Sequence, residues 1–270
     1  LLDYRVISTP AARSNFSYQY GLSNLDLERI EVIRGTNSAL YGPGVEGGVV
    51  HFITKKAIDH PGTSAELYTG NLSSRGGAVR HAYANKSKTF GYKINVKYNE
   101  GNDFGLDLVE DADRISTFYT TISQPAIKNK VVDGTQSGTP LLTMSDLDTN
   151  NDGNPMASEY QNLAMNAHFE FRPNENTTAT FSGGFSDAGG IGIQDLGYFY
   201  NQGLDYWAHA RVASGNIFAQ ISYNSNDGGD ENNPTFLYET GNRVVGKREF
   251  YVANVQYDLD IPSFLDSKFN

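Results

Sequence analysis

The chain has 270 residues, of which 39% are hydrophobic, and its formal net charge is −10. This acidic balance excludes nucleic acid as a partner, because binding nucleic acid needs a basic surface. The chain contains no cysteine and no run of eighteen apolar residues, which excludes disulfides, thiolate metal sites and a transmembrane helix. The 17 tyrosines and 15 phenylalanines are instead typical of a β-barrel with a narrow apolar outer face and a wet interior.

The first sixty residues contain two predicted strands on either side of a glycine-rich corner. Ile30–Arg34 alternates and carries β-branched residues, and Val49–Thr54 is apolar enough to be buried on both faces inside a barrel. Gly42–Gly47 fits the spacing G-x-G-x-x-G, but it opens a strand rather than the helix that a dinucleotide site requires. We therefore interpret these glycines as a sharp corner that needs positive φ. A Pro-Gly turn at residues 61–62 then closes a linker.

The ordered motifs of residues 27–56 resemble the end of the plug domain of TonB-dependent outer-membrane receptors. In that family the pattern runs (I/L)ERIEV(L/I)RG, a small-residue turn, ALYG, a glycine corner and a strand that ends in ITK. Here the stretch reads LERIEVIRGTNSALYGPGVEGGVVHFITKK, with His51 where asparagine is more usual. The plug-motif residues that we carry over are Glu28, Arg29, Glu31, Arg34, Gly35, Tyr41, Gly42, Gly47 and Gly48.

The charged residues of the first strand have two interpretations. Arg29, Glu31 and Arg34 alternate with apolar residues, which is typical of a half-buried strand with one solvated face. The resemblance favours the second interpretation, in which these charges pair with the inner wall of a barrel and hold the plug in place. Neither interpretation makes them catalytic.

From Thr63 onward the sequence alternates with period two, which predicts eight strands. Three segments alternate strongly, at Tyr92–Tyr98, Leu163–Arg172 and Glu249–Leu259. Weaker segments lie at Ser64–Gly70, Gly77–Asn85, Thr177–Ser186, Tyr206–Ala213 and Ile217–Asn224. Several approach the roughly 9–11 residues that a tilted membrane strand needs.

The connections between these segments alternate between short and long. Short turns are expected near residues 73–75, 86–88, 173–175 and 214–215, and long polar loops at Gly101–Tyr160, Ala188–Leu204 and Asn226–Lys247. Short turns on one side and long loops on the other are typical of an outer-membrane barrel, although a soluble β-sandwich also has turns of varied length.

We predict an all-β fold: a partial transmembrane antiparallel β-barrel of the 22-stranded class, with the C-terminal part of an N-terminal plug domain. Residues 1–60 would be that part of the plug, and residues 61–270 the first eight or so barrel strands with long extracellular loops. A partial wall leaves two open edges in lipid, so we expect the chain to be a piece of a longer protein.

The longest predicted loop contains a complete calcium-loop spacing. The twelve residues 148–159 fit D-x-[DN]-x-[DN]-G-x5-E. In this hypothesis Ca²⁺ is a structural cofactor that orders the loop, and the alternative is a solvated Asp/Asn/Gly loop. The predicted ligands are Asp148, Asn150, Asp152, the carbonyl of Asn154 and Glu159.

Aromatic residues gather around the predicted loop at Ala188–Leu204. Tyr198–Tyr200, Tyr206 and Trp207 would form either an interfacial belt or a stacking surface for a sugar or aromatic ligand.

The resemblance implies TonB-dependent active import of a scarce nutrient across the bacterial outer membrane. An iron chelate, cobalamin, an oligosaccharide or a peptide would be the cargo, and a surface ligand-binding or adhesion barrel without transport is the alternative. The receptor would be of the type found in Bacteroidetes, and its expected partners are outer-membrane lipid, TonB through a segment N-terminal to this chain, the nutrient, and a surface lipoprotein. The sequence contains neither a G-x-S-x-G elbow nor zinc-type histidine spacing, so it gives no support for an enzyme.

Overall fold

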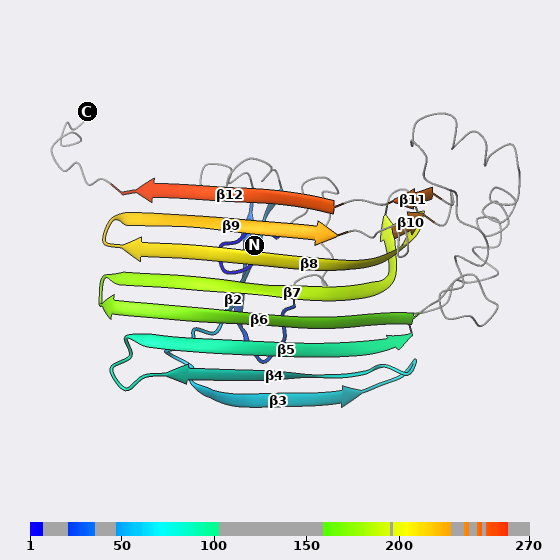
Figure 1. Ribbon diagram of the computed structural model, residues 1–270, viewed down its shortest axis with the longest axis horizontal. Coiled ribbons are helices and arrows are strands. Elements are labelled where there is room, and N and C mark those ends of the chain that lie inside the picture. Colours follow the sequence, from blue (N-terminus) through cyan, green and yellow to red (C-terminus); the bar gives the residue numbers. More distant parts are fainter. Residues whose placement is uncertain are drawn as a thin grey trace, which may run out of the picture.

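Figure 1 shows the computed structural model, in which every described element is a strand. The structure describes residues 1–7, 21–35, 47–102, 159–194, 197–227, 235–237, 242–244 and 247–258. Among these residues, none forms a helix with the length and hydropathy to cross a membrane. The strands are β1 (Leu27–Arg34), β2 (Gly48–Thr54), β3 (Gly62–Thr69), β4 (Arg75–Ala84), β5 (Phe90–Asn102), β6 (Glu159–Asn174), β7 (Thr177–Gln194), β8 (Gly197–Ser214), β9 (Ile217–Asp227), β10 (Thr235–Leu237), β11 (Asn242–Val244) and β12 (Lys247–Tyr257).

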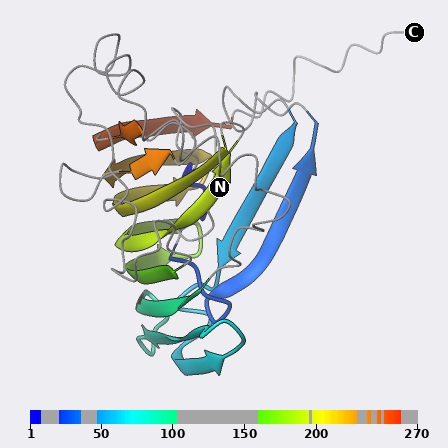
Figure 2. The same cartoon turned by 90° about the vertical axis from the view of Figure 1, so that its right-hand side faces the viewer.

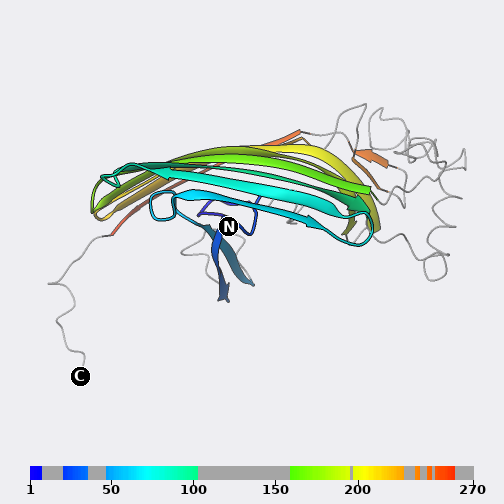
Figure 3. The ribbon, with the colours of Figure 1, turned by 90° about the horizontal axis from the view of Figure 1, so that it is seen from below.

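The strands form two sheets. β1 and β2 pair with each other in antiparallel fashion, and the other ten strands form one large antiparallel sheet, which we call the wall. Figures 2 and 3 show that the wall is curved and that the β1–β2 pair lies on its concave side. The all-β prediction is therefore confirmed.

Most strands of the wall pair with their neighbours in the sequence. From β3 to β9 each strand is hydrogen-bonded to the next, and β9 also pairs with β12. Two of the predicted short turns show why the chain reverses where it does. Asn85 accepts the N–H groups of Thr89 and Phe90 through its side chain, and Gly215 has a φ of 55° between β8 and β9.

One predicted loop is wrong. Ala188–Leu204 was expected to be a long polar connection, but β7 continues to Gln194 and β8 begins at Gly197, in continuous register from Ala188↔Gly203 to Gln194↔Gly197. This stretch contains five glycines among its seventeen residues, a composition that resembles that of a loop. The short strands β10 and β11 also fall inside the predicted loop at Asn226–Lys247.

The wall is organised with apolar side chains outside and polar side chains inside. On β12 the outward row includes Tyr251, which is 70% exposed, and Val255, which is 77% exposed. On β6 the alternate residues Asn166 and Glu170 face the concave side and are buried. This is the arrangement that a barrel strand has between lipid and a polar interior, and it confirms the faces predicted by the alternation.

Candidate functional site

The N-terminal segment is attached to the wall by a buried ionic group, which we call the Asp26 cluster (Asp26, Arg80, Lys93 and Asn95). Arg80 Nε donates to Asp26 Oδ1 at 2.8 Å, and Lys93 Nζ donates to Asp26 Oδ2 at 2.8 Å. Asn95 Nδ2 donates to the same Oδ2 at 3.1 Å. The side chains of Asp26, Arg80 and Lys93 are only 3–4% exposed. One carboxylate therefore holds two buried cations.

Local structure explains why these residues meet. Asp26 lies in a turn in which its own N–H and that of Leu27 both donate to Ser23 O, so its side chain is held at the entry to β1. Arg80 on β4 is directly opposite Asn95 on β5, and Lys93 is two residues away on the same face. Since residues i and i+2 of a strand point to one side, these donors converge on a single carboxylate.

The end of β2 joins the same network. Lys93 Nζ also donates to Thr54 Oγ1 at 2.6 Å and to Lys55 O at 2.8 Å. Thr54 in turn donates from its backbone N–H and its hydroxyl to the Asp3 carboxylate. Burial alone would raise the pKa of Asp3, but the nearby Lys93 and His168 and the two bonds from Thr54 together lower it below its ordinary value. The turn that precedes β1, the end of β2 and the wall thus share one hydrogen-bond network.

The linker after β2 also packs on the wall. Ala57 and Ile58 are fully buried, and Ile58 N–H donates to Glu170 Oε2 at 3.3 Å. A side chain at Gly91 would place its first carbon 2.8 Å from Ile58 Cγ1, so glycine on β5 permits this close approach. Arg172 on β6 then forms a two-pronged ion pair with Asp59, at 2.8 and 2.7 Å.

A second attachment lies farther along the wall. The Arg5 guanidinium stacks over the ring of Trp207 on β8, 4.1 Å from its centroid, and donates to Asn224 on β9. Trp207 thus faces the N-terminal segment, whereas the adjacent Tyr206 packs against Tyr223 with ring centroids 5.9 Å apart. Of the predicted aromatic cluster, Tyr206 and Trp207 therefore lie on opposite faces of the wall, and the side chains of Tyr198–Tyr200 lie outside the described residues.

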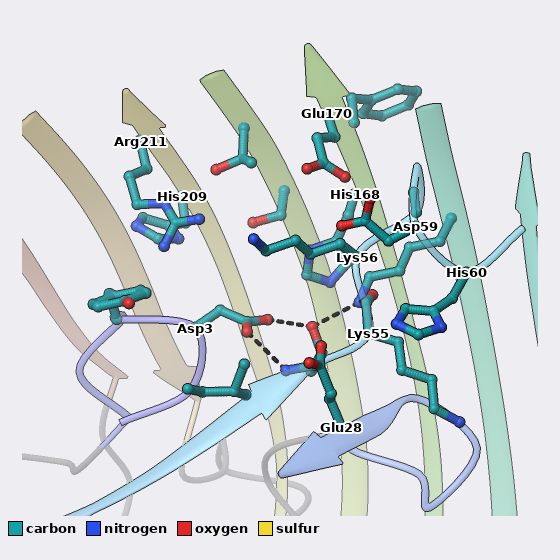
Figure 4. A pocket seen from close by; sticks show the side chains of 18 of the residues that line it. Asp3, Glu28, Lys55, Lys56, Asp59, His60, His168, Glu170, His209 and Arg211 are labelled. Carbon is teal, nitrogen blue, oxygen red and sulfur yellow. Dashed lines mark hydrogen bonds between the residues drawn. The ribbon is translucent and has the colours of Figure 1, made fainter. Parts of the chain in front are cut away.

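A cavity of about 220 Å³ lies between the N-terminal segment and the inner face of β5–β8. Figure 4 shows that charged residues from both sides point into it, including Lys56 and Asp59 from the linker and Arg211 from β8. The described walls contain carboxylates, ammonium groups, hydroxyls and imidazoles in close proximity. This composition is suited to binding a polar or charged group or water rather than an apolar ligand.

The structure describes seven of the nine predicted plug-motif residues, and Tyr41 and Gly42 lie outside the described residues. Arg29 pairs with Glu31 at 2.8 Å and with Glu28 at 3.2 Å, all on β1, which matches the interpretation of a solvated charged face. Gly35 and Gly48 both have positive φ, and a side chain at Gly48 would collide with the carbonyl oxygen of Ile33. Ion pairs with the wall come from Asp26 and Asp59, which the motif does not include.

His51 occupies the β2 position where the family pattern has asparagine. Its ring is 1% exposed, its Nε2 accepts the Tyr4 N–H at 3.1 Å, and its Nδ1 lies 3.7 Å from the Glu31 carboxylate. Burial is the main cause that lowers the pKa of His51, and the acceptor role of Nε2 requires a neutral ring with its proton on Nδ1. His51 is thus a buried structural residue that ties residues 3–5 to β2.

The predicted calcium ligands fall almost entirely outside the described residues. Only Glu159 is described, as the first residue of β6, and it has a partner there. Within the described ranges, no group of three or more His, Asp or Glu residues is placed to hold a metal ion. The calcium site therefore stays a prediction.

Curated proteins with similar sequences are siderophore receptors. The chain is 29% identical over 153 residues to the probable TonB-dependent siderophore receptor PirA of Acinetobacter baumannii, which covers 53% of this chain and 19% of that protein. It is 30% identical over 159 residues to the ferric enterobactin receptor of Pseudomonas aeruginosa, covering 52% and 20% respectively. No family model matches the chain. These relatives give no support to an affinity with Bacteroidetes.

Solved structures show the same fold. A mutant of the ferric enterobactin receptor from Pseudomonas aeruginosa aligns with 94% of this chain and 37% of its own, with a TM-score of 0.51 and 17% identity. This likeness confirms the fold class of a partial barrel with part of a plug. The chain spans about a fifth of the length of the curated relatives that it matches.

Proposed function

Because the chain is related to the TonB-dependent outer-membrane receptors, we propose that the protein imports a ferric siderophore across the bacterial outer membrane. The single observation that carries this proposal is the sequence likeness to two siderophore receptors. Among the cargoes that the resemblance allows, an iron chelate is favoured, because both relatives are named for siderophores. The outer-membrane location agrees with the kinship and with the apolar outer face of the wall.

The arrangement of the two sheets supports a division of the chain into two domains. We assign residues 1–60 to the C-terminal portion of a plug and residues 61–270 to the first strands of the barrel. In support, β1–β2 forms its own sheet, and the turn that precedes β1 contacts the wall through the polar Asp26 cluster. Buried ions regain their hydration when such a cluster separates, which offsets much of the lost attraction and suits an element that must move for cargo to pass.

The proposed partners follow from the same function. Lipid would contact the outward apolar row, and TonB would supply the work that displaces the plug. A surface lipoprotein remains a further candidate partner. The relatives are receptors rather than enzymes, and we propose no catalytic step for the protein.

The decisive experiment measures uptake of radioactive iron bound to a catecholate siderophore in cells that lack other iron receptors. Expression of the full-length protein should restore uptake and growth under iron limitation, and deletion of TonB should abolish both. Binding of the ferric siderophore to cells without any TonB-dependent uptake would favour the alternative of a ligand-binding barrel. Absence of both binding and uptake would refute the siderophore as cargo.

A further inference from the structure

We propose that the cavity between the linker and the inner wall binds a small oxyanion, of the size and charge of inorganic phosphate, through Lys56 and Arg211. Lys56 lies on the linker that follows β2, and Arg211 lies on β8 of the wall. Figure 4 shows both side chains pointing into the cavity. This site would be present whether or not the protein carries a siderophore.

The acidic groups of the cavity are already committed to other partners. Four carboxylates line it: Asp3, Glu28, Asp59 and Glu170. Asp59 and Glu170 both accept bonds from Arg172, and Asp3 accepts two bonds from Thr54. Glu28 is paired with Arg29 on the same strand. Each of these carboxylates therefore already accepts hydrogen bonds from described residues before any ligand enters.

The five cations that line the cavity differ in how far their side chains are already bound. Lys93 is held by the Asp26 cluster, Arg29 by two glutamates, and Lys55 donates to the carbonyl oxygen of Leu25 at 2.8 Å. Within the described residues, the Lys56 side chain has no hydrogen bond or ion pair, although its charge is near enough to Asp59 to help lower the pKa of that carboxyl. The Arg211 side chain contacts the ring of Tyr4, 4.7 Å from its centroid. The cavity thus has two cationic side chains, Lys56 and Arg211, whose N–H donors have no acceptor among the described residues.

Neutral donors complete the wall side of the site. Thr180 on β7 is directly opposite Arg211 on β8, and Ser182 is directly opposite His209. All four residues line the cavity. An oxyanion has several acceptor lone pairs and is bound most strongly by a combination of charged donors and hydroxyls. The guanidinium, the ammonium and two hydroxyls provide that combination.

The size of the cavity limits the ligand. A volume of about 220 Å³ is below the roughly 300–1,000 Å³ of pockets that hold drug-sized molecules. It is several times the roughly 30 Å³ that one water occupies in the liquid. The cavity therefore suits a tetrahedral oxyanion with a few waters, and it excludes an intact metal chelate.

Binding would connect two parts of the molecule that move apart if the plug is displaced. The anion would bridge Lys56 on the linker to Arg211 on the wall, next to the Asp59–Arg172 ion pair. Since a ligand that binds only the closed arrangement stabilises it, the anion should strengthen the attachment of the linker to the wall.

The test uses the full-length receptor in detergent at low ionic strength, with inorganic phosphate as the probe. Phosphorus NMR line broadening should show saturable binding, and sulfate should compete with it. Lys56→Gln and Arg211→Gln should each weaken binding by about ten-fold, as expected for the loss of one charge-assisted contact. Lys56→Arg and Arg211→Lys should retain most of the affinity, and they guard against a loss caused by misfolding.

Lys86→Gln is the matched control, because it removes one positive charge from an exposed turn of the same wall. It should leave phosphate binding unchanged. The proposal is overturned if the unmodified receptor shows no saturable binding, as would happen if an acidic side chain of the same protein fills the cavity. It is also overturned if Lys56→Gln and Lys86→Gln have equal effects, since that result indicates non-specific attraction.

Discussion

Replacing Asp26 by asparagine is expected to loosen the N-terminal segment from the wall by about 3 kcal/mol. The substitution preserves the shape of the side chain but removes the charge that compensates Arg80 and Lys93. Both cations are 3–4% exposed, so water cannot take the place of the carboxylate without opening the interface. Breaking a buried ion pair by removing one partner typically costs about 3–5 kcal/mol, because the other charge is left uncompensated.

The contacts that remain place the cost near the lower end of this range. Without the carboxylate, Lys93 keeps its bonds to Thr54 Oγ1 and Lys55 O, and Arg80 keeps its bond to His60 O at 2.9 Å. These acceptors satisfy part of each cation's hydrogen-bonding capacity but none of its charge. A loss of about 3 kcal/mol corresponds to a roughly 100-fold increase in the population of the opened state.

Hydrogen exchange of the full-length receptor in detergent measures this opening directly. The amide of Lys55 donates to Asp26 O at 2.7 Å, and the amide of Leu27 donates to Ser23 O at 3.2 Å, so both report on the attachment. In Asp26→Asn these amides should exchange about 100-fold faster if exchange follows the opening equilibrium. Amides of the wall strands β6 and β7 should keep their rates, because their ladder does not involve Asp26.

Asp59→Asn is the matched control, since it also removes an acidic partner of a cation on the wall. The side chain of Asp59 is 41% exposed, so its pair with Arg172 should be worth less than about 1 kcal/mol. The reasoning is refuted if Asp26→Asn accelerates exchange no more than Asp59→Asn does. It is equally refuted if exchange rises uniformly over the whole wall.

Three further predictions concern other parts of the chain. Bonds from Arg172 lower the pKa of Asp59, so the charged carboxylate stabilises the folded protein. The free energy of unfolding of the unmodified protein should exceed that of Asp59→Asn by its full amount above the ordinary aspartate pKa of about 3.9, and this difference should vanish as the pH falls through the lowered pKa. Unfolding measured at a series of pH values checks this. Ile221→Arg, at an outward position that is 54% exposed, should lower the free energy of unfolding in a bilayer by about 2–4 kcal/mol. Asn254→Arg, on the other face of the wall, should lower it far less, and equal losses would contradict the assignment of faces. If residues 148–159 bind Ca²⁺, calorimetry should show saturable binding that Glu159→Gln weakens at least about ten-fold, and no binding would mean a solvated loop.

The sequence predicts the wall well because each strand has a local signal. Alternation at Leu163–Arg172 and Glu249–Leu259 identifies both the strands and their faces, since period two needs no information about distant residues. The stretch at Ala188–Leu204 lacks this signal. Its glycines and amides are typical of loops in soluble proteins, but they are equally compatible with a strand whose backbone is satisfied by neighbours on both sides.

The attachment of the N-terminal segment could not be predicted in the same way. Asp26 lies 54 residues from Arg80 and 67 residues from Lys93, so no local pattern connects them. The only available signals were that Lys93 and Asn95 fall on the polar side of an alternating segment and that Asp26 directly precedes the plug motif. Trp207 is a similar case, because its inward position depends on a contact with Arg5, 202 residues earlier in the sequence.

The pairing order of the strands has a consequence for how the chain folds. Strands β3 to β9 pair with immediate neighbours, so most wall contacts close short loops and can form early and quickly. The contacts of the N-terminal segment span much longer separations, up to 219 residues between Arg5 and Asn224. The N-terminal segment, which precedes the wall in the sequence, is therefore expected to find its partners after the wall strands have paired. Until then its exposed charges, rather than a packed core, must keep it soluble, and a chaperone that holds unfolded outer-membrane chains would act longest on this region.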